Sequence, residues 1–286
     1  PITDYVIEAV RGPRLNDQDD FSVKFWAVRG SIACSGPETV RYGGNTSSLE
    51  VRCGDRIILL DGGSGIRYLG NELVTQGPLD VDLFLTHTHF DHVCGLPFFT
   101  PFFVPPSKFR ICAGHLLPEH NVEFVLSEMM MAPLFPVPMA IFNADLSFMD
   151  FMSGDTLDLG DGIVMRTAPL NHPNRATGYR IEYGGRSICY ITDTEHVQGE
   201  PDENVAGLIH GADLVIYDGT YTDEEFPNHI SWGHSTWQEG LRMCEANDVK
   251  RYVLFHHDPQ RNDDQLDEIG RQLEARRHLR PPHHRD

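Results

Sequence analysis

Short apolar runs, separated by polar turns, recur along the chain and predict ten β-strands. The run 81–85 (VDLFL) is representative, because it is too short for a helix and ends at a polar turn. Two pairs of runs are joined by Gly54-Asp55 and Gly184-Gly185, which are signals for hairpin turns. The predicted strands cover residues 23–28, 48–53, 56–60, 81–86, 109–112, 163–167, 179–183, 187–192, 213–217 and 251–255.

Four helices are predicted between these strands, at residues 65–75, 119–131, 235–247 and 263–279. In the third, Trp237, Leu241 and Cys244 recur at helical spacing, and Ser235 with Gln238 three residues later is expected to form a capping box. Strands and helices alternate in both halves of the chain, which is typical of an α/β fold.

The length of 286 residues and a hydrophobic content of 40% are sufficient for one domain with an ample core. We expect this domain at residues 21–280, with a mobile extension at 1–20 and a mobile tail at 281–286. No run approaches the roughly 20 apolar residues of a membrane span, so no membrane partner is expected.

The segment 132–150 is rich in proline and large apolar side chains and follows three consecutive methionines. Proline excludes a long helix there. Two interpretations remain open for this segment. In the first, the segment has a function as a cap over a cleft or as a homodimer surface, for which adaptable methionines are suited. In the second, it packs on the core as an ordinary loop.

Three histidines and an aspartate fall within six residues directly after the run 81–85: His87, His89, Asp91 and His92. Residues two apart in an extended chain share a face, so His87 and His89 can point to one side. Four such ligands are too many for one zinc ion that keeps an open position, and they suit two metals. The alternative is a coincidental cluster of polar residues at a strand end.

This H-x-H-x-D-H pattern resembles the signature of the metallo-β-lactamase superfamily. The resemblance implies three further ligand positions, and they occur in the expected order: His172, Asp193 at the end of an apolar run, and His256 or His257 after the last predicted strand. These motifs extend over residues 23 to 275. They imply the four-layer αβ/βα sandwich of the superfamily, built as a single domain.

The resemblance also implies two metal sites with a shared carboxylate. His87, His89 and His172 form one, Asp91, His92 and His256 form the other, and Asp193 bridges them. His256 is favoured over His257 because Leu-Phe-His resembles the Leu-Thr-His of the ribonuclease Z branch. We expect two divalent metal ions; imidazole and carboxylate ligands suit zinc, and manganese or iron satisfy them as well.

A second motif, Gly233-His234-Ser235-Thr236, resembles the Gly-His-Ser-Thr motif of ribonuclease Z and related phosphodiesterases. In that branch the histidine is thought to protonate the leaving oxygen, which implies a catalytic role for His234 beside the metal ligand Asp91. Asp218 occupies the position of a glutamate in ribonuclease Z and would hold the imidazole. The alternative for His234 is a structural histidine tied to the helix cap.

Two neighbouring residues are expected to support the site without binding metal. Asp61, in an Asp-x-Gly turn that resembles one of the superfamily, is expected to support the metal-binding loop. Cys94 lies two residues past His92, and its offset from the motif favours a buried wall residue. The six cysteines include no C-x-x-C pair, and no secretory leader precedes Phe21, which predicts a reduced, cytoplasmic protein.

The net charge argues against a large nucleic acid as partner. Lys and Arg number 23 against 42 Asp and Glu, which gives −19, whereas a transfer-RNA nuclease needs a basic surface for the backbone. No insertion resembles the long arm by which ribonuclease Z grips RNA. A small phosphodiester, which feels mostly the local field of the metals, remains compatible as the partner.

These observations together predict a dinuclear metal-dependent hydrolase. We expect a phosphodiesterase for small substrates, cyclic nucleotides among them, in which a hydroxide that bridges the metals attacks phosphorus and His234 is the general acid. The alternatives are hydrolysis of a lactone, lactam or thioester at the same site, and a non-hydrolytic member that only binds metal.

Overall fold

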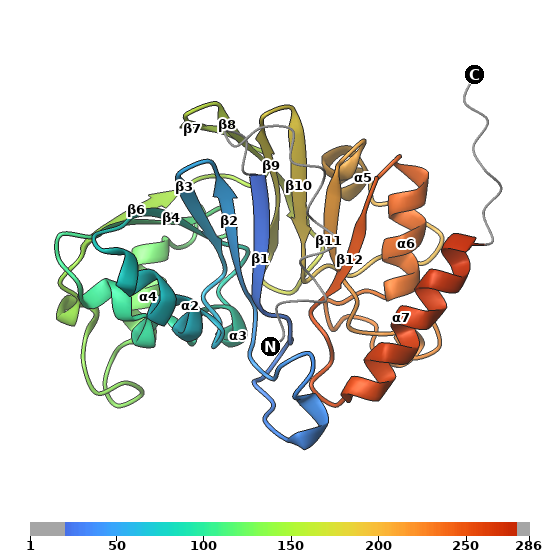
Figure 1. Cartoon of the computed structure of the whole chain (residues 1–286), viewed down its shortest axis with the longest axis horizontal. Helices are drawn as coiled ribbons and strands as arrows, with labels where there is room; N and C mark the ends of the chain where they lie inside the picture. The colour runs from blue at the N-terminus through green and yellow to red at the C-terminus, as the bar shows by residue number, and fades with distance from the viewer. Residues whose placement is uncertain (1–20, 279–286) are drawn as a thin grey trace.

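Two six-stranded sheets face each other, with helices on both outer faces (Figure 1). The computed structural model describes residues 21–278, so the predictions for residues 1–20 and 281–286 lie outside the described residues. The four-layer αβ/βα sandwich predicted for this chain is confirmed. All ten predicted strands are present, with ends displaced by at most three residues.

The first sheet contains the strands of the N-terminal half in sequence order. They are β1 (Phe21–Ala27), β2 (Ser48–Cys53), β3 (Arg56–Leu60), β4 (Asp80–Leu85), β5 (Lys108–Ala113) and β6 (Asp145–Asp150). The first three pair antiparallel, and β3 to β6 pair parallel. The change to parallel pairing follows from the helices and loops that return the chain between these strands.

The second sheet repeats this plan in the reverse direction. From one edge to the other its strands are β12 (Tyr252–Phe255), β11 (Leu214–Asp218), β10 (Arg186–Ile191), β9 (Ala176–Tyr183), β8 (Ile163–Leu170) and β7 (Thr156–Gly160). Strands β7 to β10 pair antiparallel, and β10 to β12 pair parallel. Each sheet therefore has a parallel part in which successive strands end at the same edge.

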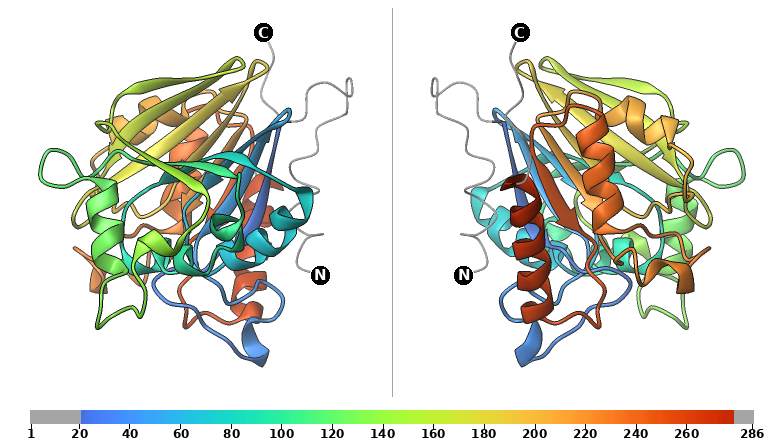
Figure 2. Two further views of the ribbon diagram at one scale, coloured as in Figure 1. Left: turned by 90° about the vertical axis from the view of Figure 1, so that its left-hand side faces the viewer. Right: turned by 90° about the vertical axis from the view of Figure 1, so that its right-hand side faces the viewer.

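The helices form the two outer layers (Figure 2). Those on the first sheet are α2 (Ile66–Leu73), α3 (Phe90–Val93) and α4 (Val122–Met129), and those on the second are α5 (Glu203–Ile209) and α6 (Trp237–Ala246). Helix α7 (Asp263–His278) packs on α6 through Leu266 and Ile269, which contact Trp237. Short 3-10 segments lie at Pro37–Thr39, Val74–Gln76, Leu96–Phe98, Thr100–Phe103, Met139–Ile141 and Phe226–Asn228.

The main core lies between the sheets and takes side chains from both. Phe84 of β4 contacts Tyr179 of β9 edge-to-face, with ring centroids 5.6 Å apart, and Tyr190 of β10 contacts Phe255 of β12. The Tyr179 hydroxyl donates to the carbonyl of Leu85, where β4 ends. This packing fixes the strand ends of the two sheets against each other.

The sequence did not predict β6, β7, α3 or α5. Both strands are outer strands of their sheets and place exposed residues among half-buried or buried ones, so they lack the continuous apolar run that marks most of the predicted strands. Helix α5 has only seven residues and depends on a cap from Asp202. The predicted capping box of α6 was wrong by one residue: Thr236 is the N-cap, and its hydroxyl accepts from the backbone N–H of Glu239.

The unusual segment 132–150 divides into two parts. Residues 145–150 form β6, and the part before it lines, together with α4, an apolar cavity of about 750 Å³. Phe142 and Leu146 pack against the core, whereas Leu134 is 84% exposed. Core packing, one of the two interpretations, therefore holds for part of this segment. Among the described residues, no helix is both long enough and apolar enough to cross a membrane.

Candidate metal centre

The candidate centre lies where strands of both sheets end. The turn after β4, which includes α3, carries His87, His89, Asp91 and His92. The segments that follow β8, β10 and β12 carry the remaining three predicted ligands, which are His172, Asp193 and His256. Because neighbouring parallel strands end at the same edge of a sheet, residues far apart in sequence meet there. All seven side chains lie in one cluster.

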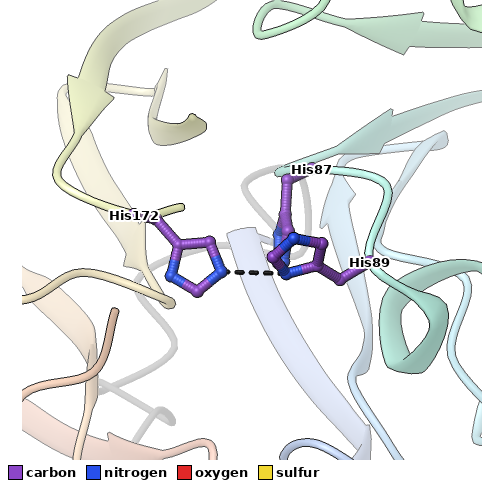
Figure 3. A group of neighbouring side chains, drawn as sticks. All are labelled: His87, His89 and His172. Carbon is purple, nitrogen blue, oxygen red and sulfur yellow. Dashed lines mark hydrogen bonds between the residues drawn. The ribbon is translucent and has the colours of Figure 1, made fainter. Parts of the chain in front are cut away.

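Three histidines form the first group, as Figure 3 shows. The Nε2 atom of His172 lies 3.0 Å from Nδ1 of His89. The ring of His87 lies 4.5 Å from that of His89 and 4.7 Å from that of His172, measured between centroids. These three rings therefore converge from two different sheets on one point.

Asp91, His92, Asp193 and His256 form the second group, and all four are buried. The Nε2 atom of His256 lies 3.2 Å from an oxygen of Asp91 and 3.2 Å from an oxygen of Asp193. The other oxygen of Asp193 lies 3.2 Å from Nε2 of His92. Asp193 also approaches the first group, at 3.8 Å from Nε2 of His87, so it stands between the two groups.

Each histidine is oriented by a contact on its outer nitrogen. Nδ1 of His92 lies 2.9 Å from Asp61, Nδ1 of His172 lies 2.7 Å from the carbonyl oxygen of Gly233, and Nε2 of His89 lies 3.4 Å from the side-chain oxygen of Asn174. An outer nitrogen that donates to such an oxygen leaves a lone pair on the inner nitrogen of a neutral ring.

The remaining two histidines are held by threonine hydroxyls. The Thr86 hydroxyl lies 3.1 Å from Nδ1 of His87, and the Thr220 hydroxyl lies 3.1 Å from Nδ1 of His256. Each hydroxyl also lies within 3.0 Å of an aspartate oxygen, to which it can donate while it accepts from the ring. All five imidazoles are therefore arranged to present a lone pair inward.

This arrangement fits divalent metals. The buried Nε2 atom of His87 has no hydrogen-bond partner, and the buried Nε2 atom of His92 lies near carboxylate oxygens of Asp91 and Asp193 without forming a hydrogen bond to them. The inner lone pairs of His89 and His172 face each other across 3.0 Å, which is repulsive unless a cation lies between them. Imidazole nitrogens and carboxylate oxygens in groups of three and four are the donor sets that zinc and related metals take.

The electrostatic environment also favours a cation. Burial lowers the pKa of His87, which keeps its imidazole neutral as a metal ligand must be. Burial opposes charge on His92 as well, but the carboxylates of Asp193, Asp91 and Asp61 raise its pKa well above the ordinary value. The negative charge that attracts a proton to His92 would attract a metal ion equally.

Asp61 contacts the turn that carries four of the candidate ligands, which agrees with the supporting position expected from the sequence. Its carboxylate accepts hydrogen bonds from the backbone N–H and the hydroxyl of Thr86 and from the Tyr190 hydroxyl, at 2.8 to 3.0 Å. The same carboxylate contacts His92. One buried side chain thereby joins β3, β4, β10 and the α3 turn.

Several residues around the centre have a left-handed backbone that residues other than glycine rarely adopt. Among them are Asp61, Asp193 and His256, with φ of 61°, 59° and 56°. Asp61 and His256 directly follow strands, and one residue, Thr192, separates Asp193 from the end of β10. Strained backbone of this kind concentrates at functional sites. No sequence pattern had indicated it.

His234 and Asp218 form a pair beside the second group. Nδ1 of His234 lies 3.0 Å from a carboxylate oxygen of Asp218, so the shorter side chain at this position does reach the ring. Burial would lower the pKa of His234, but Asp218 raises it to about 9. The ring of His234 lies 4.7 Å from that of His256, nearly parallel to it.

Two residues near the motifs stay outside the four groups of potential metal ligands found among residues 21–278. The ring of His257 packs edge-to-face against Tyr42, and its backbone N–H donates to the carbonyl of Val28. The Cys94 thiol lies 3.8 Å from the Thr46 hydroxyl. All six cysteines are free thiols.

Sequence reasoning missed Glu195. Its carboxylate accepts from the backbone N–H of Ser231 at 2.9 Å and of Gly233 at 2.8 Å, and its own N–H donates to the carbonyl of Asn171. Glu195 therefore ties the turn before His234 to the segment that carries His172. Gly233 has φ 83°, and a Cβ there would lie 2.2 Å from Nδ1 of His172, so glycine is required.

A family model described as a beta-lactamase superfamily domain matches residues 56–257, which include every candidate ligand. The chain belongs to this family. Members of the β-lactamase superfamily with this fold use divalent metals, in agreement with the donor set.

Curated ribonuclease Z proteins resemble part of this β-lactamase superfamily chain. The ribonuclease Z of Haloferax volcanii is 31% identical over 104 residues, which are 36% of this chain and 29% of that protein. The ribonuclease Z of Clostridium perfringens is 34% identical over 83 residues, 29% of this chain and 25% of that protein. The chain therefore matches less than a third of the length of these relatives.

A solved structure shows that the fold extends over most of the chain. The metallo-beta-lactamase fold protein YhfI from Bacillus subtilis aligns with a TM-score of 0.66 and 17% identity, over 89% of this chain and 93% of that one. At this identity the likeness shows a common fold alone.

Proposed function

We propose that this protein is a dinuclear metal-dependent phosphodiesterase that acts on small phosphodiesters. The observation that carries the proposal is the contact of 3.0 Å between His234 and Asp218, beside the cluster of the seven predicted ligands. His87, His89 and His172 would hold one divalent metal ion, and Asp91, His92 and His256 the other, with Asp193 between them. Zinc suits this donor set.

Bound divalent ions would supply two kinds of chemistry here, activation of water as a nucleophile and neutralisation of charge on phosphoryl oxygens. The residues of the chain hold the side chains of the site in place for that chemistry. The outer contacts of the five histidines fix the rings, and the burial of Asp91 and Asp193 keeps bulk water away from their carboxylates.

His234 would supply the proton that the leaving group needs. Its Nδ1 is held by Asp218, which leaves Nε2 as the atom that can protonate a departing alkoxide. The carboxylate of Asp218 raises the pKa of His234 and thereby favours the charged imidazolium. Asp218 is itself held by the backbone N–H groups of Asp193 and Thr220.

The charge of the molecule favours a small substrate. A net charge of −19 repels a polyanion such as RNA, and a nuclease for transfer RNA would need basic residues to neutralise backbone phosphates. The likeness to ribonuclease Z covers about a third of the chain and supports the chemistry of a phosphodiester rather than the size of the substrate.

A substrate screen with metal-loaded protein tests the proposal. We expect turnover of bis-p-nitrophenyl phosphate and of cyclic nucleotides, with little turnover of lactones, thioesters or nitrocefin, and loss of activity after chelation. Preferred hydrolysis of a lactone, lactam or thioester would replace the proposal with carbonyl hydrolysis at the same site. Efficient 3′ processing of a transfer-RNA precursor at physiological salt would overturn the prediction of substrate size.

A further inference from the structure

Two exposed large apolar side chains lie close in sequence to residues of the candidate centre. Phe90, between His89 and Asp91 in sequence, is 73% exposed, and Trp232, two residues before His234, is 61% exposed. A single exposed apolar side chain is ordinary on a protein surface. When such side chains neighbour candidate ligand residues, however, they are candidates for contact with a bound molecule. The substrate is the natural candidate for that molecule.

Trp232 is exposed and nevertheless held in place. Its ring meets the ring of His229 at 88°, with centroids 5.1 Å apart, and its backbone N–H donates to the carbonyl of His229. The residues on both sides of it, Ser231 and Gly233, donate their backbone N–H groups to the carboxylate of Glu195. The indole is therefore presented to solvent from a fixed turn.

A series of aromatic rings connects Trp232 to the general acid. His229 stacks on Tyr221 with centroids 4.1 Å apart, and Tyr221 meets His234 edge-to-face at 6.1 Å. On the other side of Trp232, the carbonyl oxygen of Gly233 contacts Nδ1 of His172. The position of the indole is thus fixed relative to both His234 and the three-histidine group.

The indole ring of Trp232 is suited to bind a planar group of the substrate. An indole with a free face binds nucleobases and other aromatic rings by stacking, and a fixed ring does so with little loss of conformational entropy. The net charge of −19 contributes no long-range attraction for an anionic substrate, so apolar contacts must supply affinity beyond the phosphoryl group. Because Trp232 precedes His234 by two residues and is connected to it through the rings of His229 and Tyr221, we assign the planar group to the alcohol that leaves.

We propose that Trp232 is a stacking platform for a nucleobase on the leaving-group side of the phosphodiester. This inference rests on the proposed function and names its substrate class, nucleotides. It is specific to Trp232, because Trp237 is buried and Trp26 is half-buried. The indole fluorescence of Trp232 therefore reports directly on a base that stacks on it.

Equilibrium binding to the zinc-loaded protein tests the inference without any turnover. AMP should bind on the order of 5- to 100-fold more tightly than ribose 5-phosphate and should quench tryptophan fluorescence. Trp232→Ala should remove this difference and the quenching, while affinity for ribose 5-phosphate and zinc content stay unchanged. Trp232→Phe should keep most of the difference, and Trp232→Leu should lose it.

Phe124→Ala supplies the control, since Phe124 is an exposed aromatic residue on α4 and should leave all affinities unchanged. If wild type binds both esters with equal affinity, or if Trp232→Ala or Trp232→Leu keeps the preference for AMP, the stacking platform is wrong although the proposed function stands. If neither ester nor inorganic phosphate binds, the proposed function fails, and this inference fails with it.

Discussion

At the scale of single residues, the candidate centre depends on which nitrogen of each imidazole is left free. Thr86, Thr220, Asn174, Asp61 and a backbone carbonyl each contact one ring nitrogen and direct the other inward. Such outer partners fix the tautomer of a metal-binding histidine and its orientation. As a consequence of these outer contacts, the inner nitrogen of each imidazole points into the cluster around Asp193.

Asp193→Ala is expected to lose one of two tightly bound metal ions per chain. The carboxylate lies within 3.9 Å of His87, His92, His172 and His256, so its removal opens the space between both groups. Elemental analysis of metal-loaded and extensively dialysed protein measures the stoichiometry. A wild type that retains a single tightly bound ion would contradict the dinuclear mechanism, and a variant that still retains two would contradict the bridge.

His234→Ala is expected to slow hydrolysis of an alkyl phosphodiester about 10²- to 10⁴-fold, because a poor leaving group needs the proton. A p-nitrophenyl leaving group departs without much protonation, so its hydrolysis should suffer clearly less. Asp218→Asn should show a milder form of the same pattern. Measured kcat values for both substrates decide the question, with metal content as the control.

Equal losses for both leaving groups would mean that His234 positions the substrate or holds the helix cap. No loss for either would remove His234 from the mechanism and favour hydrolysis of a lactone or thioester.

The clustering of the candidate ligands could be predicted from sequence, whereas their outer contacts could not. His87, His89, Asp91 and His92 lie in one short turn, so their proximity follows from the chain itself. Thr220 and Asn174 reach the rings only because particular strand ends meet in the fold. The predicted capping box at Ser235 was wrong for a similar reason. Helix α6 begins one residue later than expected, so Ser235 does not cap it, and the Ser235 hydroxyl contacts His196 instead.

At the scale of elements, ten strands, including the edge strands β1 and β12, were predictable because short apolar runs mark them in the sequence. The outer strands β6 and β7 were not, since half of each is in contact with solvent. The loops that carry the candidate site follow strand ends, and hydrogen bonds of Glu195 connect two of these loops. Glu195 links the turn 231–233 to Asn171, next to His172.

Glu195→Gln is expected to weaken metal binding at the three-histidine group by about 10- to 100-fold. A glutamine offers one acceptor oxygen to two backbone N–H groups, so the turn loosens and the contact between Gly233 and His172 weakens. Titration of the apoprotein with zinc measures this. Glu200→Gln, a change at an exposed side chain of the same loop, is the matched control. Unchanged zinc affinity in Glu195→Gln would show that the turn needs only one of these bonds.

At the scale of the whole molecule, the dominant property is negative charge. A field from −19 charges repels anionic substrates, and salt screens that repulsion with a Debye length of about 10 Å at 0.1 M. The KM for a singly charged phosphodiester is therefore expected to fall, or at most stay constant, as salt rises from about 20 to about 200 mM. Steady-state kinetics in sodium chloride measure it. A KM that rises steeply with salt would indicate a basic binding surface and a polyanionic substrate.

The distribution of the seven ligands between the two sheets has a consequence for biosynthesis. The turn after β4 emerges from the ribosome early, whereas Asp193 and His256 follow only with the second sheet. A nascent chain folds its N-terminal part first, and that part alone offers four of the seven donors. If these seven side chains hold the metals as proposed, tight capture of metal waits until β12 has paired, which would make cofactor loading a late step of maturation.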